Sequence, residues 1–254
     1  MMDLNLKGKN AVIVGGARGI GRATAELLAS EGANIALCAR NQEHVDEAVA
    51  SLAAKGVRAT GAVVDVTDDA VYRAWVAAAA EELGGIDIFI GMASAGGGVM
   101  GEEGWRNNFE TDILGTTRGI EAALPFLEKS DSASIILMSS TAAVENFLVA
   151  QPYNALKAAL ITYGSQLSQS LAADGIRVNT VSPGPTFVDG GNWDMIKNHA
   201  PDIYDTTLAS SPVGRLGTPD EVANAIVFLA SPAAGFITGA NLVVDGGFTK
   251  RVQF

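Results

Sequence analysis

Short apolar runs alternate with amphipathic stretches along the whole chain. The pattern predicts seven strands, each a run of apolar or β-branched residues between glycines or polar residues. Because helical stretches separate successive strands, the strands should be parallel and covered by helices on both faces. We therefore expect one α/β domain over residues 1–254, built on a doubly wound parallel sheet. The predicted strands are Asn10–Val14, Asn34–Ala39, Val57–Val64, Ile86–Ile90, Ser134–Met138, Ile176–Ser182 and Ala240–Val244.

The stretches between the strands have helix start and stop signals. Gly32, Gly56 and Gly84 are placed to end three helices, and Thr67 or Asp68 is placed to cap one of them. The predicted helices are Arg22–Ser30, Gln42–Lys55, a segment from Thr67 or Asp68 to about Leu83, Thr111–Leu127, a helix beginning at Pro152, and Asp220–Leu229.

One region does not follow this alternation. Residues 186–211 form a mixed segment that contains Phe187, Trp193 and Tyr204. We interpret it as a substrate lobe or lid rather than a second domain, and the alternative is an ordinary surface excursion.

A glycine-rich loop joins the first predicted strand to the first helix. It has the sequence Gly15-Gly16-Ala17-Arg18-Gly19-Ile20-Gly21. Glycines let a backbone approach the phosphates of a ligand, and the following helix offers unpaired N–H groups and a positive dipole end. The loop therefore indicates dinucleotide binding, although a tight turn that needs positive φ is the alternative. The glycine-rich segment Gly91–Gly98 after the fourth strand should line the same cleft.

The end of the second strand bears on which dinucleotide is bound. An acidic residue at this position favours NAD, whereas an arginine accommodates the 2′-phosphate of NADP. This chain has Ala39 followed by Arg40, and Arg18 could bracket the same phosphate. The pattern favours NADP, and the alternative is two solvated arginines.

Tyr153 and Lys157 are four residues apart in a stretch with strong helical propensity. Both side chains should therefore project from one face of the helix. A nearby ammonium favours the ionised form of a phenol, which can then exchange protons near neutral pH. Taken alone, such a pair is more often an ordinary surface feature.

The ordered set of motifs resembles the short-chain dehydrogenase/reductase family over essentially the whole chain. The motifs are Gly15-x-x-x-Gly19-x-Gly21, Asp65, Ser140, Tyr153-x-x-x-Lys157, Pro183-Gly184 and Val244-Asp245-Gly246-Gly247, with thirteen residues from Ser140 to Tyr153. The resemblance implies a Rossmann-type sheet. It also implies that Tyr153 exchanges a proton with the substrate oxygen, Ser140 holds that oxygen, and Lys157 binds the nicotinamide ribose.

The same resemblance implies where NADP(H) binds. Asp65 would contact the adenine, and the turn from Pro183 to Thr186 would lie on the carboxamide side. The implied cofactor-binding residues are Gly15, Ala17, Arg18, Gly19, Ile20, Gly21, Arg40, Asp65, Val66, Ala93, Ser94, Tyr153, Lys157, Pro183, Gly184 and Thr186.

Three departures from the family pattern stand out. Val14 replaces the usual Thr, and Gly91-Met92-Ala93-Ser94 replaces an Asn-Asn-Ala-Gly run. Asp112, 28 residues before Ser140, replaces a catalytic Asn. We hypothesise that Asp112 keeps the relay role of that Asn, either ionised toward Lys157 or protonated. The alternative is that it caps or pairs locally.

Composition excludes several classes of protein. The chain has 254 residues, 48% of them hydrophobic and 18% charged, which is typical of a folded domain. A formal net charge of -11 argues against a nucleic-acid partner. We also expect no membrane segment and no signal peptide, and hence a cytoplasmic protein. Because Cys38 is the single cysteine and His44 and His199 are the two histidines, we expect no metal site.

These observations predict an NADP(H)-dependent oxidoreductase that interconverts a ketone or aldehyde and an alcohol. Phe147, Phe187 and Trp193 suggest a hydrophobic or aromatic substrate. One alternative is a 3-ketoacyl-thioester reductase, which would need basic residues beside the cleft to dock an acidic carrier. A rival class is a non-reducing cofactor-binding or lyase-type protein. The family resemblance implies a homodimer or homotetramer.

Overall fold

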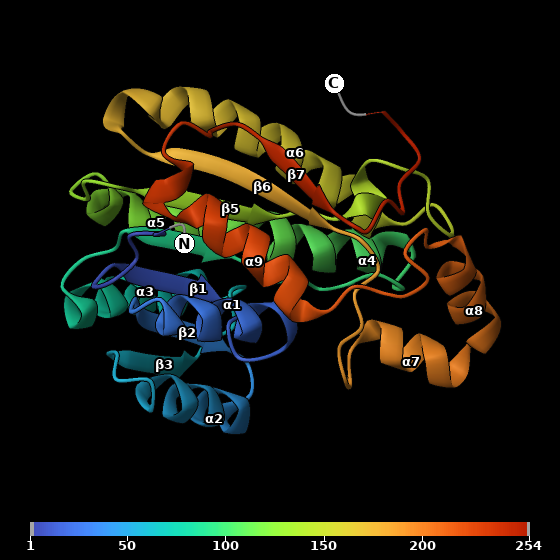
Figure 1. Ribbon diagram of the computed structural model, residues 1–254, viewed down its shortest axis with the longest axis horizontal. Coiled ribbons are helices and arrows are strands. Elements are labelled where there is room, and N and C mark those ends of the chain that lie inside the picture. The colour runs from blue at the N-terminus through green and yellow to red at the C-terminus, as the bar shows by residue number, and fades with distance from the viewer. Residues whose placement is uncertain (1–2, 253–254) are drawn as a thin grey trace.

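A seven-stranded parallel sheet forms the centre of the computed structural model, which describes residues 3–252 (Figure 1). The strand order is β3-β2-β1-β4-β5-β6-β7, and each neighbouring pair is parallel. The order reverses between β1 and β4, as in a Rossmann-type sheet. The predicted fold class is therefore confirmed. The strands are β1 Asn10–Val14, β2 Asn34–Ala39, β3 Ala59–Val63, β4 Ile88–Gly91, β5 Ser134–Met138, β6 Arg177–Pro183 and β7 Asn241–Val244.

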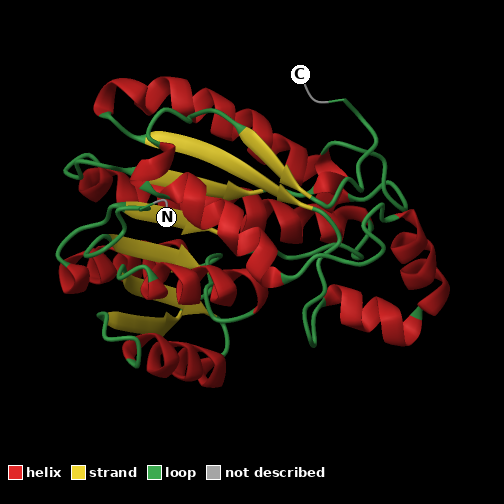
Figure 2. Ribbon diagram, in the orientation of Figure 1, coloured by secondary structure: helices red, strands yellow, loops and turns green. Residues whose placement is uncertain are grey.

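Helices cover both faces of the sheet, so each face has its own hydrophobic core (Figure 2). Successive side chains of a strand point to opposite faces. Ala11 and Ile13 of β1 accordingly join one core, and Val12 and Val14 join the other. The first core is closed by α1 Gly19–Ser30, α2 Gln42–Ala53 and α9 Pro219–Ala230, and the second by α3 Asp69–Leu83, α5 Gly115–Leu127 and α6 Pro152–Leu171.

Local signals set most helix boundaries. The Asp68 side chain caps α3 by accepting from the Val71 N–H at 3.2 Å, and Gly84 ends that helix with φ 84°. Pro152 occupies the first turn of α6. α1 begins at Gly19, three residues before the predicted Arg22, and Gly19 itself has a positive φ of 52°. Most other boundaries lie within about two residues of the prediction, the scatter expected at frayed ends.

The region before Leu127 differs from the prediction of a helix over Thr111–Leu127. A helix α4 spans Gly101–Asn108, a π-helical turn follows at Phe109–Leu114, and α5 then begins at Gly115. The sequence of α4 is polar and rich in glycine, so its apolar pattern is weak. Packing of α4 against α6 stabilises it instead. The π-helical turn is the segment that carries Asp112.

Residues 186–211 form two helices beyond the carboxyl ends of the strands (Figure 1). They are α7 Asn192–His199 and α8 Pro201–Ser210. Within residues 3–252, no helix has the length and apolar character needed to span a bilayer. Short 3₁₀ helices lie at Thr141–Ala143, Ala172–Asp174 and Pro232–Ala234.

The start of α9 predicts a pH-dependent contribution to stability. Glu221 receives hydrogen bonds from Arg215 at 2.6 Å and from the Thr218 N–H at 2.9 Å, and these lower its pKa to about 2. A lowered folded-state pKa adds stability above the usual value of 4.5, and that stability is lost as pH falls toward 2. Glu221→Gln should therefore lower the melting temperature by a few degrees at pH 7.

The control is Asp220→Asn, because Asp220 lies in the same helical turn outside the capping box. Thermal unfolding followed by circular dichroism at pH 7 and at pH 2 measures both variants. The deficit of Glu221→Gln should shrink at pH 2, and a deficit of equal size at both pH values would contradict the assignment.

Candidate active site

A cleft of about 1060 Å³ opens at the carboxyl ends of β1, β2, β3 and β4. This is the edge where open α/β sheets bind ligands, beside the point at which the strand order reverses. Of the residues predicted to bind a cofactor, those lining the cleft are Gly15, Ala17, Arg18, Arg40, Asp65, Val66, Ala93 and Ser94. The sequence interpretation missed other lining residues, among them Asn41, His44, Thr67, Asn107, Glu110 and Thr111.

The glycine loop fits a phosphate-bearing ligand because its backbone is packed too closely for side chains. A Cβ at Gly15, whose φ is 81°, would lie 3.2 Å from the Met92 carbonyl carbon. A Cβ at Gly21 would lie 2.1 Å from the Gly15 oxygen, so only glycine allows α1 to start here. No side chain caps the start of α1. Its first N–H groups can therefore bind an anion.

Several residues of the predicted set build the loop and the edge of the sheet without lining the cleft. Gly19 lies against Val188, and Ile20 packs on the first hydrophobic core. Gly184 is packed on Asp245, where a Cβ would come within 2.5 Å. Thr186 donates a hydrogen bond to the Gly184 carbonyl at 3.0 Å. These last two residues lie where β6 leads into the segment with α7 and α8.

Two arginines lie in the cleft but make different contacts. Arg40 lies near Asp65, whose pKa is lowered by hydrogen bonds from the Thr67 N–H and hydroxyl and further by the Arg40 charge. The Arg18 guanidinium donates to the Asp189 carbonyl at 3.0 Å. Arg18 therefore joins the glycine loop to the segment that leads into α7, whereas Arg40 lies at the end of β2, where a ribose phosphate is expected.

The end of β5 holds the predicted catalytic residues against α6. Ser139 donates from its hydroxyl to the Lys157 carbonyl at 2.7 Å, and the Lys157 ammonium donates to the Met138 carbonyl at 2.9 Å. Ser140 directly follows and accepts from the Ala142 N–H at 3.2 Å, which leaves its own O–H available. The Lys157 nitrogen lies 5.7 Å from the centre of the Tyr153 ring. Tyr153 is half-buried and Lys157 is buried.

Asp112 forms an ion pair with Lys157 inside the protein. The joining oxygen and nitrogen are 2.9 Å apart, and the two side chains are 1% and 4% exposed. The same carboxylate accepts from the Ser94 hydroxyl at 2.6 Å and from the Ala95 N–H at 2.9 Å. Asn108, which the sequence interpretation missed, donates to it at 3.4 Å. The π-helical turn thus connects the Gly91–Gly98 loop to the lysine of α6.

A second cavity of about 410 Å³ lies between the segment after β5, α8 and the C-terminal segment. Phe147 contributes to its wall, and the Phe147 carbonyl accepts from Asn154, the neighbour of Tyr153, at 3.5 Å. The Phe147 ring also packs against Trp193 of α7 and Phe248 of the C-terminal segment, with centroids 6.0 and 5.8 Å apart. The remaining lining residues are Glu145, Asn146, Leu148, Asp202, Ile203, Thr206, Thr207, Ser210 and Lys250.

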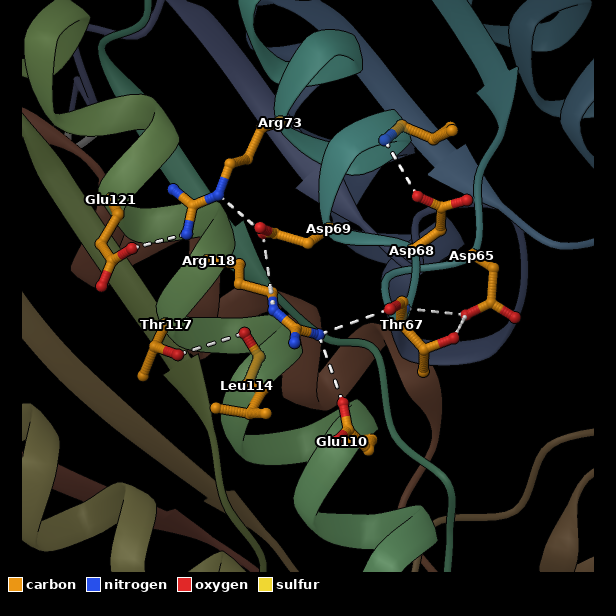
Figure 3. A network of polar contacts seen from close by, with 11 residues as sticks. Asp65, Thr67, Asp68, Asp69, Arg73, Glu110, Leu114, Thr117, Arg118 and Glu121 are labelled. Carbon is orange, nitrogen blue, oxygen red and sulfur yellow. Dashed lines mark hydrogen bonds and ion pairs between the residues drawn. The ribbon is translucent and has the colours of Figure 1, made fainter.

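A network of charged side chains supports the side of the cleft formed by Asp65 and Thr67 (Figure 3). Arg118 of α5 donates to the Thr67 carbonyl at 3.5 Å and to the Glu110 carboxylate at 3.4 Å, and lies 3.5 Å from Asp69. Arg73 also binds Asp69, and its second partner is Glu121, outside the cleft. Arg118 therefore joins the loop after β3 to the π-helical turn.

The chain matches a family model and known dehydrogenases over almost its whole length. A family model described as Enoyl-(Acyl carrier protein) reductase matches residues 15–249. The chain is 39% identical to isoepoxydon dehydrogenase patN of Penicillium expansum over 259 residues, covering 100% of both chains. It is 36% identical to 2,5-dichloro-2,5-cyclohexadiene-1,4-diol dehydrogenase LinX of Sphingobium indicum, covering 99% of this chain and 100% of LinX.

A solved structure shares the whole architecture. L-Sorbose reductase from Gluconobacter frateurii, complexed with NADPH and L-sorbose, superposes with a TM-score of 0.90 at 32% identity. The match covers 99% of this chain and 100% of the reductase.

The arginine network predicts an effect on binding at the cleft. Arg118→Met should weaken the binding of a nicotinamide dinucleotide about two- to five-fold, because exposed or half-exposed ion pairs contribute less than about 1 kcal/mol each. Arg73→Met is the matched control, since it removes a comparable pair that includes no cleft residue. Isothermal titration calorimetry measures both affinities, and equal losses in the two variants would show that Arg118 has no particular role at the cleft.

Proposed function

Since the chain belongs to the short-chain dehydrogenase/reductase family, we propose that it is an NADP(H)-dependent oxidoreductase that interconverts a ketone or aldehyde and the corresponding alcohol. The observation that carries the proposal is the arrangement of Tyr153 and Lys157 on one face of α6. This face packs on the end of β5 that bears Ser140, and Lys157 is joined through Asp112 to Ser94, which lines the large cleft.

A nicotinamide cofactor supplies or accepts the hydride when it is bound. The role of the protein is to hold the two ends of this cofactor. The glycine loop and the start of α1 offer N–H groups to the phosphates. Arg40 favours the 2′-phosphate of NADP, because no carboxylate takes the position at the end of β2 that would bind an unphosphorylated ribose.

The proton is handled by side chains of α6 and β5. In the direction of reduction, Tyr153 donates its phenolic proton to the substrate oxygen, and Ser140 holds that oxygen through its O–H. The Lys157 ammonium stabilises the resulting phenolate and keeps an N–H for the ribose hydroxyls of the cofactor. In oxidation the same groups act in reverse.

The substrate is a small carbonyl compound or alcohol that fits between Tyr153 and the lobe at 186–211. Phe147 and Phe248 provide an apolar wall in the second cavity, whereas Glu145, Asp202 and Thr206 provide polar groups. A ring or short chain that bears further hydroxyl groups suits this mixture better than a purely aromatic compound. The name of LinX specifies a cyclohexadiene diol, and that of L-sorbose reductase specifies L-sorbose. Both names support the same class of substrate.

A carrier-linked 3-ketoacyl-thioester reductase is less well supported by the site. An acidic carrier requires basic residues beside the substrate entrance. The second cavity instead combines two acidic side chains, Glu145 and Asp202, with one lysine, Lys250. A non-reducing role is also disfavoured, because it gives no use to the combination of Ser140, Tyr153 and Lys157.

The function predicts a Tyr153-dependent turnover. NADPH oxidation should be seen with some member of a panel of cyclic ketones and ketoses, and Tyr153→Phe should lower kcat by about 10²- to 10⁴-fold. Tyr163→Phe on the same helix is the matched control and should retain activity. Absence of turnover across the panel by a protein that binds NADPH would contradict the proposal.

The cofactor preference predicts a second effect. Arg40→Ala should weaken NADPH binding by about ten-fold or more, since a charged hydrogen bond to phosphate contributes about 1.5 kcal/mol or more. NADH binding should change little. Arg22→Ala, which removes an arginine paired with Glu26 on α1, is the control. Fluorescence titration of the wild type and both variants with each cofactor measures the six affinities, and equal losses for NADPH and NADH would refute the role of Arg40.

A further inference from the structure

The Asp112 carboxylate is surrounded by hydrogen-bond donors. Oδ1 accepts from the Lys157 ammonium and the Ser94 hydroxyl, and Oδ2 accepts from the Ala95 N–H and the Asn108 amide. The Ser94 oxygen itself accepts from the Gly96 N–H at 3.1 Å, so its proton is directed to Asp112. Four donors therefore converge on two oxygens.

This geometry requires a carboxylate rather than the amide of the family pattern. An Asn side chain has one acceptor oxygen. In either orientation of the amide, its NH₂ group would face two hydrogen-bond donors instead of acceptors. The two departures at Ser94 and Asp112 are thus linked. The serine hydroxyl that replaces a family glycine supplies a donor for the carboxylate that replaces the family asparagine.

The pair is isolated from other charges. Lys157 is the one charged residue of α6, and β4, β5 and the Gly91–Gly98 loop contain none. The nearest charged groups on the packed segments have partners elsewhere or lie at the surface. They are Glu110, paired with Arg118; Glu102 and Arg106, paired with each other; Glu103, which is exposed; and Glu145, which accepts from the Lys250 N–H.

We propose that Asp112 is a fixed counter-ion that offsets the charge of Lys157 and so keeps the Tyr153 phenol protonated to higher pH, favouring reduction. The inference rests on the proposed function. The Lys157 nitrogen lies 5.7 Å from the centre of the Tyr153 ring, where an uncompensated ammonium would favour the phenolate. The carboxylate 2.9 Å from that nitrogen opposes this effect. Asp112 acts through Lys157, as a positioning residue.

The test is the pH at which the Tyr153 phenolate forms. The chain has four tyrosines, so the absorbance at 295 nm of each protein, minus that of its Tyr153→Phe counterpart, reports this phenol without any turnover. Asp112→Asn should move the rise in absorbance about one pH unit lower. The pH–rate profile of alcohol oxidation should move in the same direction by a similar amount, whereas Asp112→Glu, which keeps the charge, should retain the wild-type midpoint.

Asp87→Asn is the matched control. Asp87 also pairs with a lysine, Lys9, and accepts from a backbone N–H and the Ser130 hydroxyl, but it lies before β4 at the opposite end of the sheet. Its loss should change stability and leave the Tyr153 midpoint in place. A midpoint for Asp112→Asn that moves no further than that of Asp87→Asn would overturn the proposal.

A second variant covers the case in which Asp112→Asn does not fold. Ser94→Gly with Asp112→Asn restores the family residues at both positions and should show the same downward shift. Ser94→Gly alone keeps the carboxylate and should retain the wild-type midpoint. If no carbonyl compound is turned over but the absorbance shift occurs, the proposed function fails and the counter-ion assignment holds. If turnover occurs without the absorbance shift, the proposed function holds and the counter-ion assignment fails.

Discussion

A lysine ammonium can be buried only if acceptors replace the water that it loses. Lys157 meets this requirement with the Met138 carbonyl and the Asp112 carboxylate, each 2.9 Å away. An ammonium has three N–H donors, so one remains for a ligand. The protein thereby fixes the Lys157 side chain in position. Its two internal partners also set the direction of the one N–H that remains for a ligand.

The fold supplies these partners from three segments that are distant in the sequence. Met138 comes from the carboxyl end of β5, Lys157 from the second turn of α6, and Asp112 from a π-helical turn between α4 and α5. Insertions of this kind in a helix often mark functional sites, because the extra residue redirects a side chain. Here the turn brings a carboxylate toward the loop after β4, where Ser94 and Ala95 bind it.

The sequence predicted the sheet well because its strands are buried runs with glycine or polar residues at their ends. It predicted α4 poorly, since the polar segment Gly101–Asn108 is stabilised by its packing on α6 rather than by a local pattern. The predicted cofactor-binding residues at the ends of β1, β2, β3 and β4 line one cleft, as expected for residues that follow parallel strands. The role of Asn108 was not predicted, because the predicted helix began only at Thr111 and so left Asn108 outside it.

The central claim is that the cleft and the buried pair together receive NADPH. A crystal structure of the protein with NADP⁺ tests this most directly. The account predicts the 2′-phosphate beside Arg40, the pyrophosphate at the start of α1, and the nicotinamide ribose within hydrogen-bond distance of the third Lys157 N–H, with the Asp112 pair intact. A cofactor bound away from Lys157, or an ammonium that leaves Asp112 to reach it, would contradict the account.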